Sequence, residues 1–215
     1  MLVSHFLDFL EFHACSYISL KSGRGYWSLM KRCFDILVSA VALLIFAVPV
    51  LVVMGLVRIT SPGPSLYWSA RIGKGGTTFQ MPKLRTMAVD TPELPTHEFE
   101  NPEAYITGFG RFLRKSSIDE IPQLYSVLTG DMSIVGPRPM IPQYEEIVQR
   151  RQKAGVDVLR PGITGWAQVN GRDNITTAEK LELDVDYLQR RSFFFDMFII
   201  YRTFIYVFSG SGVRH

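Results

Sequence analysis

The sequence predicts an α+β protein that is mainly helical, with one long apolar membrane helix, interfacial amphipathic helices and a small β-hairpin. Three observations predict this class. One apolar run occupies residues 33–59, residues 61–87 combine strand-like stretches with turn residues, and several later stretches repeat apolar residues at helical spacing. The organisation expected from them is an N-terminal extension at 1–30, a membrane helix at 31–60 and a larger polar domain at 61–215.

The composition is typical of a protein that contacts lipid. Of the 215 residues, 47% are hydrophobic and 13% are aromatic, and aromatic rings favour the membrane interface. The net charge of +3 suits anionic lipid or phosphate ligands and is too small to indicate nucleic acid binding. The two cysteines and four histidines show no metal-binding spacing. Any acid, base or nucleophile is therefore expected among the carboxylates.

The first 30 residues carry apolar side chains at Leu2, Phe6, Phe9 and Leu10. This pattern fits an amphipathic surface helix, and it fits a loosely attached terminus equally well. The sequence therefore leaves the role of residues 1–30 open.

The apolar run from Cys33 to Ile59 is long enough to cross a bilayer, because as a straight helix it would measure ~40 Å against a hydrocarbon core of about 30 Å. Basic residues flank both of its ends, so they do not assign one end to the cytoplasm. Pro49 lies inside the run and removes one helical hydrogen bond. A single span and a re-entrant helix that enters and leaves on the same face both satisfy these observations.

Residues 61–87 predict a short β-hairpin with a basic edge, and the acidic, proline-containing residues 88–105 predict a long mobile loop. A helix is expected next, around Phe109–Lys115. The basic residues of the hairpin, each of which is on its own typical of a solvated face, are Arg71, Lys74, Lys83 and Arg85.

Two adjacent carboxylates, Asp119 and Glu120, lie in the stretch SSIDEIPQ. With Ser117 they match the capping box S-x-x-E at the start of a helix, where acidic residues also complement the helix dipole. This helix is expected to continue to Gly130, which stops it. From this stretch alone, capping is the more common role for such a pair, and a catalytic role depends on the rest of the chain.

The stretch SIVGPRPM holds Arg138 on a stiff backbone, because Pro137 and Pro139 restrict it on both sides. Such an arginine suits a phosphate or a planar base edge, although a proline-rich connection with a surface arginine is the alternative. Residues 159–176 are rich in glycine, which permits close backbone approach and an anion nest, but they match no dinucleotide or P-loop motif. The polar and glycine residues of interest in this segment are Arg160, Gln168, Asn170, Gly171 and Arg172.

Three further helices are expected. Residues 141–155 are charged and predict an exposed helix, and the stretch TAEKLELDVDYLQRR predicts an amphipathic helix with Leu181, Val185 and Leu188 on one side. Residues 192–208 are nearly apolar but short for a membrane span, so an interfacial helix in the headgroup plane fits them better.

Three segments taken together resemble the bacterial sugar transferase family, the monotopic phosphoglycosyl transferases. They are KRCFDILVSAVALLIFAVPVL, LRKSSIDEIPQLYSVLTGDMSIVGPRP and RPGITGWAQVNGR, and the likeness covers about residues 31–213. The resemblance implies a re-entrant helix-break-helix at 31–60 and a cytosol-facing catalytic domain at 61–215, on the cytoplasmic face of the bacterial inner membrane.

The resemblance also implies an activity. Family members transfer a phosphosugar from a UDP-sugar to polyprenyl (undecaprenyl) phosphate, which gives a polyprenyl-diphosphate sugar and UMP at the first membrane step of glycoconjugate biosynthesis. The implied partners are a UDP-sugar donor, a polyprenyl phosphate acceptor and membrane lipid, and no nucleic acid. A homodimer is compatible with the sequence, which does not report the oligomeric state.

Site residues follow from the same resemblance. The family's Asp-Glu dyad falls on Asp119 and Glu120, with Asp119 as the nucleophile of a covalent aspartyl-phosphosugar intermediate, and its conserved-motif arginines fall on Arg114 and Arg138. A Mg²⁺ ion held by the dyad is expected to reduce the repulsion between carboxylate and diphosphate. The substrate-binding set is completed by Pro137, Lys83, Arg85, Arg160, Gln168, Asn170, Gly171 and Arg172.

One departure from the family pattern concerns the membrane helix. Val48 precedes Pro49 where the family usually has serine, and valine offers no hydroxyl group for the carbonyl that proline frees. Either the sterics of Pro49 suffice for the break, or the bend is shallower. Two alternatives in function remain: a membrane-anchored sugar-nucleotide-binding or scaffold protein without turnover, and a single-span enzyme with other phosphoryl chemistry.

Overall fold

The computed structural model describes the backbone of residues 2–91, 102–171 and 175–209. Most of the loop expected at 88–105 lies outside the described residues, and so does Arg172. The chain divides into two compact units, Met1–Phe34 and Asp35–His215. The first is part of helix α1 (Leu2–Thr60), which continues into the second.

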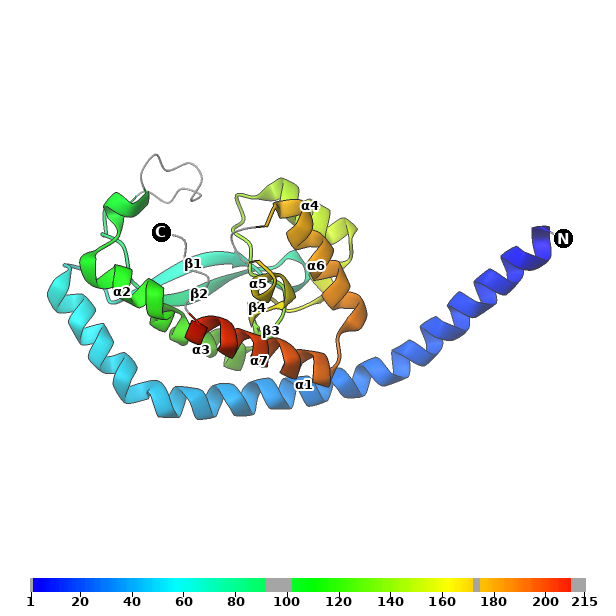
Figure 1. Cartoon of the computed structure of the whole chain (residues 1–215), viewed down its shortest axis with the longest axis horizontal. Helices are drawn as coiled ribbons and strands as arrows, with labels where there is room; N and C mark the ends of the chain where they lie inside the picture. The colour runs from blue at the N-terminus through cyan, green and yellow to red at the C-terminus, as the bar shows by residue number, and fades with distance from the viewer. Residues whose placement is uncertain (1, 92–101, 172–174, 210–215) are drawn as a thin grey trace. The chain divides into compact units, whose positions relative to one another are not determined.

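Helix α1 is continuous through Pro49 and bends in its second half (Figure 1). Proline explains a bend in this part, because it lacks the N–H group of the helical hydrogen bond and its ring crowds the preceding turn. Within the described residues, the segment Ser28–Thr60 is the one helix long and apolar enough to cross a membrane. Only 6% of its most apolar window is buried, which distinguishes it from the core helix of a soluble protein.

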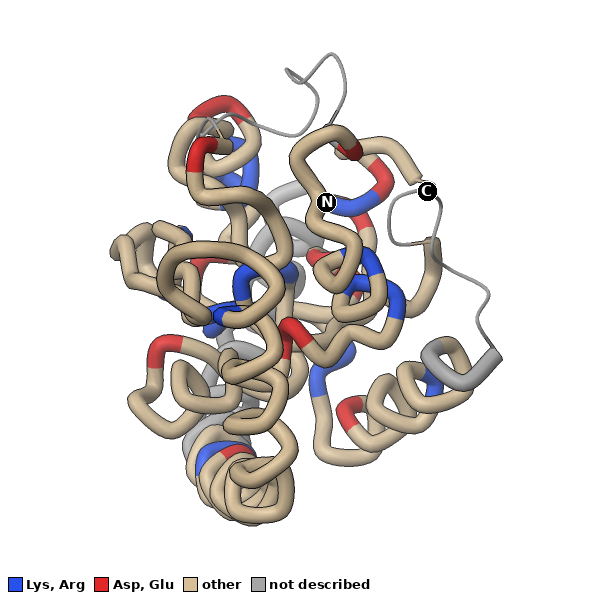
Figure 2. Tube along the Cα trace, turned by 90° about the vertical axis from the view of Figure 1, so that its left-hand side faces the viewer, with Lys and Arg blue, Asp and Glu red and all other residues tan. Residues whose placement is uncertain are grey.

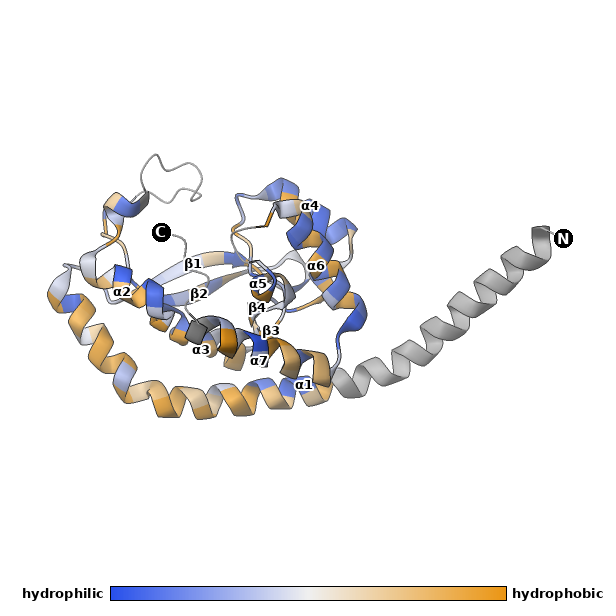
Figure 3. Cartoon of the chain, viewed as in Figure 1, coloured by the Kyte–Doolittle hydropathy of each residue, from blue (hydrophilic) through white to orange (hydrophobic). Residues whose placement is uncertain are grey.

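The exposed surface of α1 is strongly apolar. Leu44, Val48 and Ile59 are 78%, 69% and 83% exposed, and Figure 3 shows the apolar residues as a nearly continuous orange band along the coloured, C-terminal half of the helix. Helices α1 and α7 (Phe193–Ser209) lie lowest in Figure 1. In the turned view of Figure 2 they are again at the bottom, and little of this region is coloured as charged. An exposed apolar surface of this extent marks contact with lipid or with another protein, so α1 is compatible with a membrane anchor.

Within the second unit, the other side of residues 35–60 of α1 packs on the rest of the unit at two separate places. Near its C-terminal end, Val57 is buried with Leu84 and Leu113. Near the start of the unit, the buried Asp35 accepts hydrogen bonds from the Ser133 hydroxyl (2.8 Å) and from the Ile134 N–H group (3.3 Å). A carboxylate inside an apolar helix is tolerated here because these donors satisfy it.

The predicted hairpin is confirmed. Strands β1 (Leu66–Ile72) and β2 (Thr78–Leu84) pair antiparallel, and the turn between them holds η1 (Lys74–Gly76). The turn needs glycine, because Gly75 and Gly76 have φ values of 67° and 78°. The helix expected around Phe109–Lys115 is also confirmed, as α2 (Gly108–Ser116), which follows η3 (Pro102–Tyr105).

A second, parallel sheet of two short strands was not expected. Strand β3 (Ser133–Val135) pairs with β4 (Gly162–Thr164), and both strands come from segments in which the sequence predicted no strand. Glycine is required for this contact: a Cβ atom on Gly162 would lie 2.1 Å from the Gly136 nitrogen, and one on Gly165 would lie 2.1 Å from the Gly136 oxygen. The close approach that glycine permits therefore joins two chain segments here.

The remaining helices surround this sheet. The charged helix expected at 141–155 is confirmed as α4, and the amphipathic helix after Thr176 as α6, which begins with a capping box between Thr176 and Glu179. The core on this side consists of Val135, Val169, Tyr187, Phe195 and Ile199. The elements are α4 (Glu145–Lys153), η5 (Val156–Val158), α5 (Trp166–Val169), α6 (Thr177–Arg190) and α7 (Phe193–Ser209).

Candidate active site

The carboxylate pair lies at a sharp turn between two helices. Ser117 ends α2 with left-handed backbone angles (φ 56°, ψ 17°), and Asp119 and Glu120 follow in the 3₁₀ helix η4 (Ile118–Gln123), which leads into α3 (Leu124–Thr129). As expected, Gly130 ends this helical segment, with φ 99°.

The predicted capping box at Ser117 is wrong. A capping residue has extended backbone angles that direct its side chain to the free N–H groups, whereas Ser117 is left-handed and its side chain makes no capping hydrogen bond. Instead, the Glu120 N–H group donates to the Ser117 carbonyl oxygen at 3.2 Å. The carboxylates therefore do not serve as helix caps in the way the pattern suggested, and the short 3₁₀ helix offers less of a dipole than a regular α-helix.

Asp119 is buried, with 8% of its surface exposed, and this changes its titration. Burial is the largest cause that raises the pKa of the Asp119 carboxyl to about 6, and the negative charge of Glu120 raises it further. Lys83 and Arg114 act in the opposite direction without cancelling these effects. Burial, more than the balance of charges, therefore sets the titration of Asp119.

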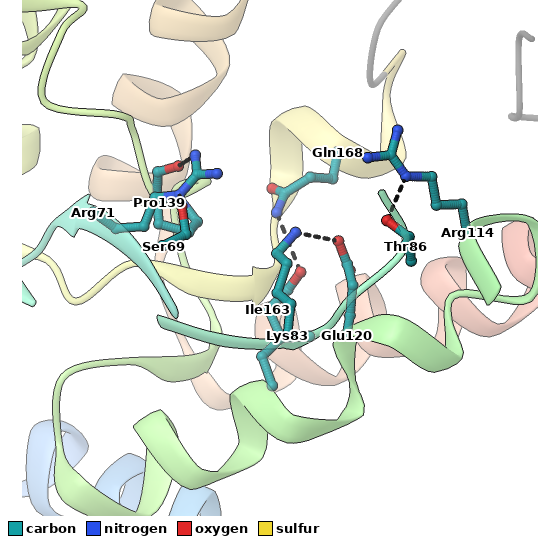
Figure 4. Close-up of polar contacts among 9 residues, drawn as sticks. All are labelled: Ser69, Arg71, Lys83, Thr86, Arg114, Glu120, Pro139, Ile163 and Gln168. Carbon is teal, nitrogen blue, oxygen red and sulfur yellow. Dashed lines mark hydrogen bonds and ion pairs between the residues drawn. The ribbon is translucent and has the colours of Figure 1, made fainter. Parts of the chain in front are cut away.

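Lys83, from strand β2, is the direct partner of Glu120. Its Nζ atom lies 3.4 Å from Glu120 Oε1, and both side chains are about four-fifths buried (Figure 4). Burial lowers the pKa of the Lys83 ammonium, and the nearby Arg138 and Arg71 lower it further, whereas Glu120 and Asp119 raise it. Lys83 thus connects the hairpin to the carboxylate pair.

Arg114 approaches the pair from the last turn of α2. Its Nε atom donates to the Thr86 hydroxyl oxygen at 2.9 Å, which orients the guanidinium group (Figure 4). Its positive charge is among the causes that lower the pKa of Asp119. Arg114 and Lys83 therefore come to Asp119 from different elements, α2 and β2.

Arg71 is a site residue that the sequence-based prediction missed. It donates from Nε to the Ser69 hydroxyl (3.1 Å) and from Nη1 to the Pro139 carbonyl (3.4 Å), next to Arg138 in the chain. Burial is the largest cause that lowers the pKa of Arg71, and the positive charge of Arg138 is the next. The signal in the sequence was the strand alternation: in the observed register Lys83 pairs with Tyr67, four residues before Arg71, so that Lys83 and Arg71 share one face of the hairpin.

A pocket of about 230 Å³ opens beside the carboxylate pair. Glu120, Arg138 and Gln168 line it together, so the structure brings these three predicted residues to one place. Gln168 is buried and donates from Nε2 to the Ile163 carbonyl at 3.4 Å. The positions of Arg138 and Gln168 therefore agree with a role in binding.

Other predicted binding residues have structural partners elsewhere. Arg85 donates to the carbonyl oxygens of Ser61 (2.6 Å) and Pro62 (2.5 Å) and so fixes the end of α1, and Arg160 donates to the Gly130 carbonyl (2.7 Å) at the end of α3. These arginines use their guanidinium groups to satisfy backbone oxygens.

The last of the predicted set also lie outside the pocket lining. Asn170 donates to the Trp166 carbonyl at 2.7 Å within its own short helix, and the Pro137 carbonyl accepts from the Gly162 N–H group at 2.9 Å. Gly171 has φ 159°, and a Cβ atom there would lie 2.5 Å from Ile175. Each of these three residues contributes to the local fold rather than to the wall of the pocket.

The described residues contain no group of three or more His, Cys, Asp or Glu side chains that could hold a metal ion. Asp119 and Glu120 nevertheless fit a Mg²⁺ ion, because this ion is commonly held by one or two carboxylates together with water and substrate phosphates. A bound cation would also stabilise the ionised form of the buried Asp119, whose pKa is raised by burial and then by Glu120.

The structure combines an apolar helix compatible with a membrane anchor with a carboxylate pair, of which Asp119 is buried, and with cations nearby. The chain belongs to the bacterial sugar transferase family, whose model matches residues 26–210. The resemblance inferred from the three segments is thereby confirmed, and the chain is a member of a family of transferases.

Two similar proteins have nearly the same length as this chain. The exopolysaccharide production protein ExoY of Rhizobium meliloti is 37% identical over 197 residues, which cover 84% of this chain and 86% of the relative. The uncharacterized sugar transferase EpsL of Bacillus subtilis is 39% identical over 190 residues, which cover 86% of this chain and 91% of the relative.

A longer relative carries a more specific name. The UDP-glucose:undecaprenyl-phosphate glucose-1-phosphate transferase of Escherichia coli is 40% identical over 197 residues, which cover 86% of this chain. The matched part is 41% of that relative, so this chain spans less than half of its length.

Proposed function

We propose that this protein is a phosphoglycosyl transferase that moves a phosphosugar from a UDP-sugar to undecaprenyl phosphate and releases UMP. The observation that carries the proposal is the buried Asp119, whose pKa is raised to about 6, in a site with four cationic side chains, of which Lys83 and Arg114 act on Asp119 itself. Relatives named for UDP-sugar and undecaprenyl-phosphate chemistry support the substrate class. The cations are Arg71, Lys83, Arg114 and Arg138.

Asp119 is the nucleophile in this proposal. In the first step one of its carboxylate oxygens bonds to the sugar-bearing phosphorus, the bond from that phosphorus to the bridging oxygen breaks, and UMP leaves with the electron pair. In the second step a phosphate oxygen of the acceptor bonds to the same phosphorus, and Asp119 leaves as a free carboxylate. A pKa of about 6 leaves Asp119 mostly ionised at neutral pH, while its burial removes the water that would otherwise solvate the attacking oxygen.

The cations reduce the repulsion between the Asp119 carboxylate and the diphosphate of the UDP-sugar. Arg114 and Lys83 reach the carboxylates from different elements and suit the oxygens of the transferring phosphate, and Arg138 at the pocket suits the nucleotide. Asp119 and Glu120 are the residues that would hold Mg²⁺ together with diphosphate oxygens. When bound, this ion would offset the negative charge and polarise the phosphorus.

We also propose that α1 is re-entrant, with the catalytic domain on the cytoplasmic face of the bacterial inner membrane. Asp35 and Val57 are separated by about 22 residues, or roughly 33 Å of helix, which is close to the thickness of a hydrocarbon core. Both contact the same domain, at Ser133 and at Leu113. A helix that crossed the bilayer would carry these two contacts to opposite sides, so the pair supports a helix that enters and leaves on one face.

Labelling of single cysteines tests this geometry. In a Cys15→Ser background, the native Cys33 is compared with a Cys33→Ser, Thr60→Cys variant, because these positions flank the apolar run on both sides. A membrane-impermeant thiol reagent added to inside-out vesicles is expected to label both positions and, added to right-side-out vesicles, neither. Labelling of the two positions from opposite sides would contradict the re-entrant geometry and leave the proposed chemistry untouched.

The activity is tested with a panel of UDP-sugars. The purified full chain in detergent, with undecaprenyl phosphate and Mg²⁺, is expected to release UMP from one or a few of the sugars. UMP should also appear, up to one equivalent per enzyme, before any acceptor is added, since the first step does not need it. Removal of the divalent ion with a chelator should stop release. Tight binding of a UDP-sugar with no UMP from any member of the panel would favour a binding protein instead.

A further inference from the structure

The pocket beside Glu120 has two kinds of wall. Glu120, Arg138 and Gln168 supply polar groups, as described above. Ser117 adds a hydroxyl group, but most of the surface inside the pocket is apolar, and four aliphatic side chains contribute to it from η4, α3, β4 and α5. The aliphatic residues are Ile121, Leu124, Ile163 and Val169.

Helix α7 closes the pocket with Thr203 and Tyr206. The Thr203 hydroxyl donates to the Ile199 carbonyl at 2.8 Å and lies 2.7 Å from the Thr164 hydroxyl oxygen, which is left to act as the donor between them. Both hydroxyl groups are therefore engaged with protein atoms. At Thr164 and Thr203, which both line the pocket, the side chains therefore present their methyl groups to it more readily than free hydrogen-bonding groups.

The outer surface of the same helix is apolar and exposed. Tyr201, Phe204 and Ile205 are 62%, 60% and 49% exposed, whereas Ile199 on the inner side is fully buried. Aromatic and aliphatic residues on one face of a helix fit the boundary between headgroups and acyl chains. One helix thus has a lipid-compatible surface on the outside and forms a wall of the catalytic pocket on the inside.

We infer, on the basis of the proposed function, that this pocket holds the first isoprene units of the polyprenyl phosphate acceptor. A UDP-sugar presents polar atoms along its whole length, and four aliphatic side chains would leave many of these atoms without partners, which costs free energy. A prenyl chain is hydrocarbon, so its burial against the same side chains is favourable. Arg138 at the pocket, which suits the nucleotide in the first step, provides in the second step, after UMP has left, a cation for the phosphate to which that chain is attached.

Filling the pocket tests the inference. Thr203→Trp and, independently, Leu124→Trp are expected to raise the KM for undecaprenyl phosphate by about 10-fold or more, because one methylene-sized change in an apolar pocket is worth roughly 10- to 200-fold. The KM for the UDP-sugar should stay within about 2-fold of the wild-type value. Tyr201→Trp is the matched control: it lies on the same helix, is exposed, and lines no part of the pocket, so both KM values should be unchanged.

Three results would overturn the inference. The first is an unchanged acceptor KM in both folded tryptophan variants. The second is a raised KM for the UDP-sugar alone, which would assign the pocket to the nucleotide. The third comes from the wild-type protein, so that it holds even where the variants fail to fold: a prenyl phosphate with a diazirine on its first isoprene unit should label peptides that contain residues 121–124 or 203–206, and labelling confined to α1 would contradict the assignment.

Failure of the proposed function is distinguishable from failure of this inference. A wild-type chain that releases no UMP with any UDP-sugar and acceptor would reject the function itself. A wild-type chain that turns over normally, with tryptophan variants that match it, would reject only the acceptor pocket.

Discussion

Two buried aspartates of this domain, Asp119 in η4 and Asp184 in α6, differ in what surrounds them. Both are largely inaccessible, at 8% and 1% exposed, and burial is the largest cause that raises the pKa of each. Asp184 has a direct partner, since Arg151 Nη2 donates to its Oδ2 atom at 2.5 Å and joins α4 to α6. For Asp119 the second cause is another carboxylate, Glu120, which raises the pKa further.

This difference separates a structural carboxylate from a reactive one. Burial of a charge is costly in both places, and a hydrogen-bonded counter-charge offsets the cost at Asp184. At Asp119 the free-energy cost of burying the charge is offset less, because the neighbouring Glu120 adds repulsion. Lys83 and Arg114 lower the pKa of Asp119 by their charge, without a direct contact comparable to that of Arg151 with Asp184. A buried carboxylate beside a second carboxylate and several cations, rather than burial alone, is the arrangement that the proposed nucleophile requires.

Replacement of the two aspartates should give opposite results, with the largest effect at Asp119. Asp119→Asn is expected to lower the rate of UMP release by about 10⁴-fold or more, because the amide cannot act as the nucleophile. The protein should also no longer gain the mass of a phosphosugar, or the label of an isotope-labelled donor, when it is mixed with the UDP-sugar. The measurement is UMP release together with intact-protein mass spectrometry, and a variant that keeps normal turnover would reject Asp119 as the nucleophile.

The same variant should be more stable than the wild-type protein. The folded-state pKa of about 6 lies above the ordinary value of 3.8, so the folded chain binds more protons than the unfolded chain between these values. Ionised Asp119 therefore lowers stability as the pH rises from about 4 to about 6, and at pH 7 the loss amounts to about 3 kcal/mol. Asp119→Asn removes this charge and should raise the free energy of unfolding by about 1–3 kcal/mol at pH 7, and much less at pH 4, in denaturant titrations.

Asp184→Asn is the paired variant of that experiment. Loss of the counter-charge leaves the Arg151 guanidinium partly buried without its carboxylate, which should lower the free energy of unfolding by about 2–3 kcal/mol. UMP release per folded molecule should remain within about 3-fold of wild type. Equal loss of activity in the two aspartate variants would remove the distinction between them.

Lys83 provides a smaller and more specific test of the active-site charge. Because its positive charge lowers the pKa of Asp119, Lys83→Met should raise that pKa further and so move the acidic limb of the pH–rate profile to higher pH than in the wild type. The rate at neutral pH should fall by about 10²-fold, from the weaker phosphate binding and the smaller ionised fraction. An acidic limb that stays in place or moves to lower pH would contradict the assigned role.

The sequence predicted the regular elements more reliably than the partners of individual arginines. The alternation and turn residues of 61–87 suffice for the hairpin, whereas the roles that the ordered motifs imply for Asp119, Arg114 and Arg138 stay predictions. Arg71 and Arg85 look alike in the sequence. Arg71 lies at the site, whereas Arg85 binds the carbonyl oxygen of Ser61, 24 residues away, and no local pattern reports a contact of that range.

The serine before the carboxylates shows a second limit. The pattern S-x-x-E predicts a cap only if the serine is extended, and that depends on the direction in which the chain arrives. Here α2 ends at the residue before Ser117 and η4 begins at the residue after it, so Ser117 has to make the turn alone, in the left-handed region. Tertiary packing of two short helices, which the octapeptide does not contain, decides this conformation.

The smallest predicted effect concerns this turn. Among the described residues Ser117 is the one non-glycine residue with positive φ, and such a conformation costs an L-residue about 1 kcal/mol. Ser117→Gly should therefore keep UMP release within about 3-fold and change the free energy of unfolding by less than about 1 kcal/mol, since relief of the strain is opposed by the greater freedom of glycine in the unfolded chain. Ser117→Val, which is β-branched, should lower the free energy of unfolding by about 1–2 kcal/mol and also slow UMP release, because the turn sets the direction of Asp119.

Ser117→Ala separates the effect of the backbone from that of the hydroxyl group, and it should behave like the wild type. Equal loss of activity in the alanine and glycine variants would show that the site requires the hydroxyl group rather than the turn.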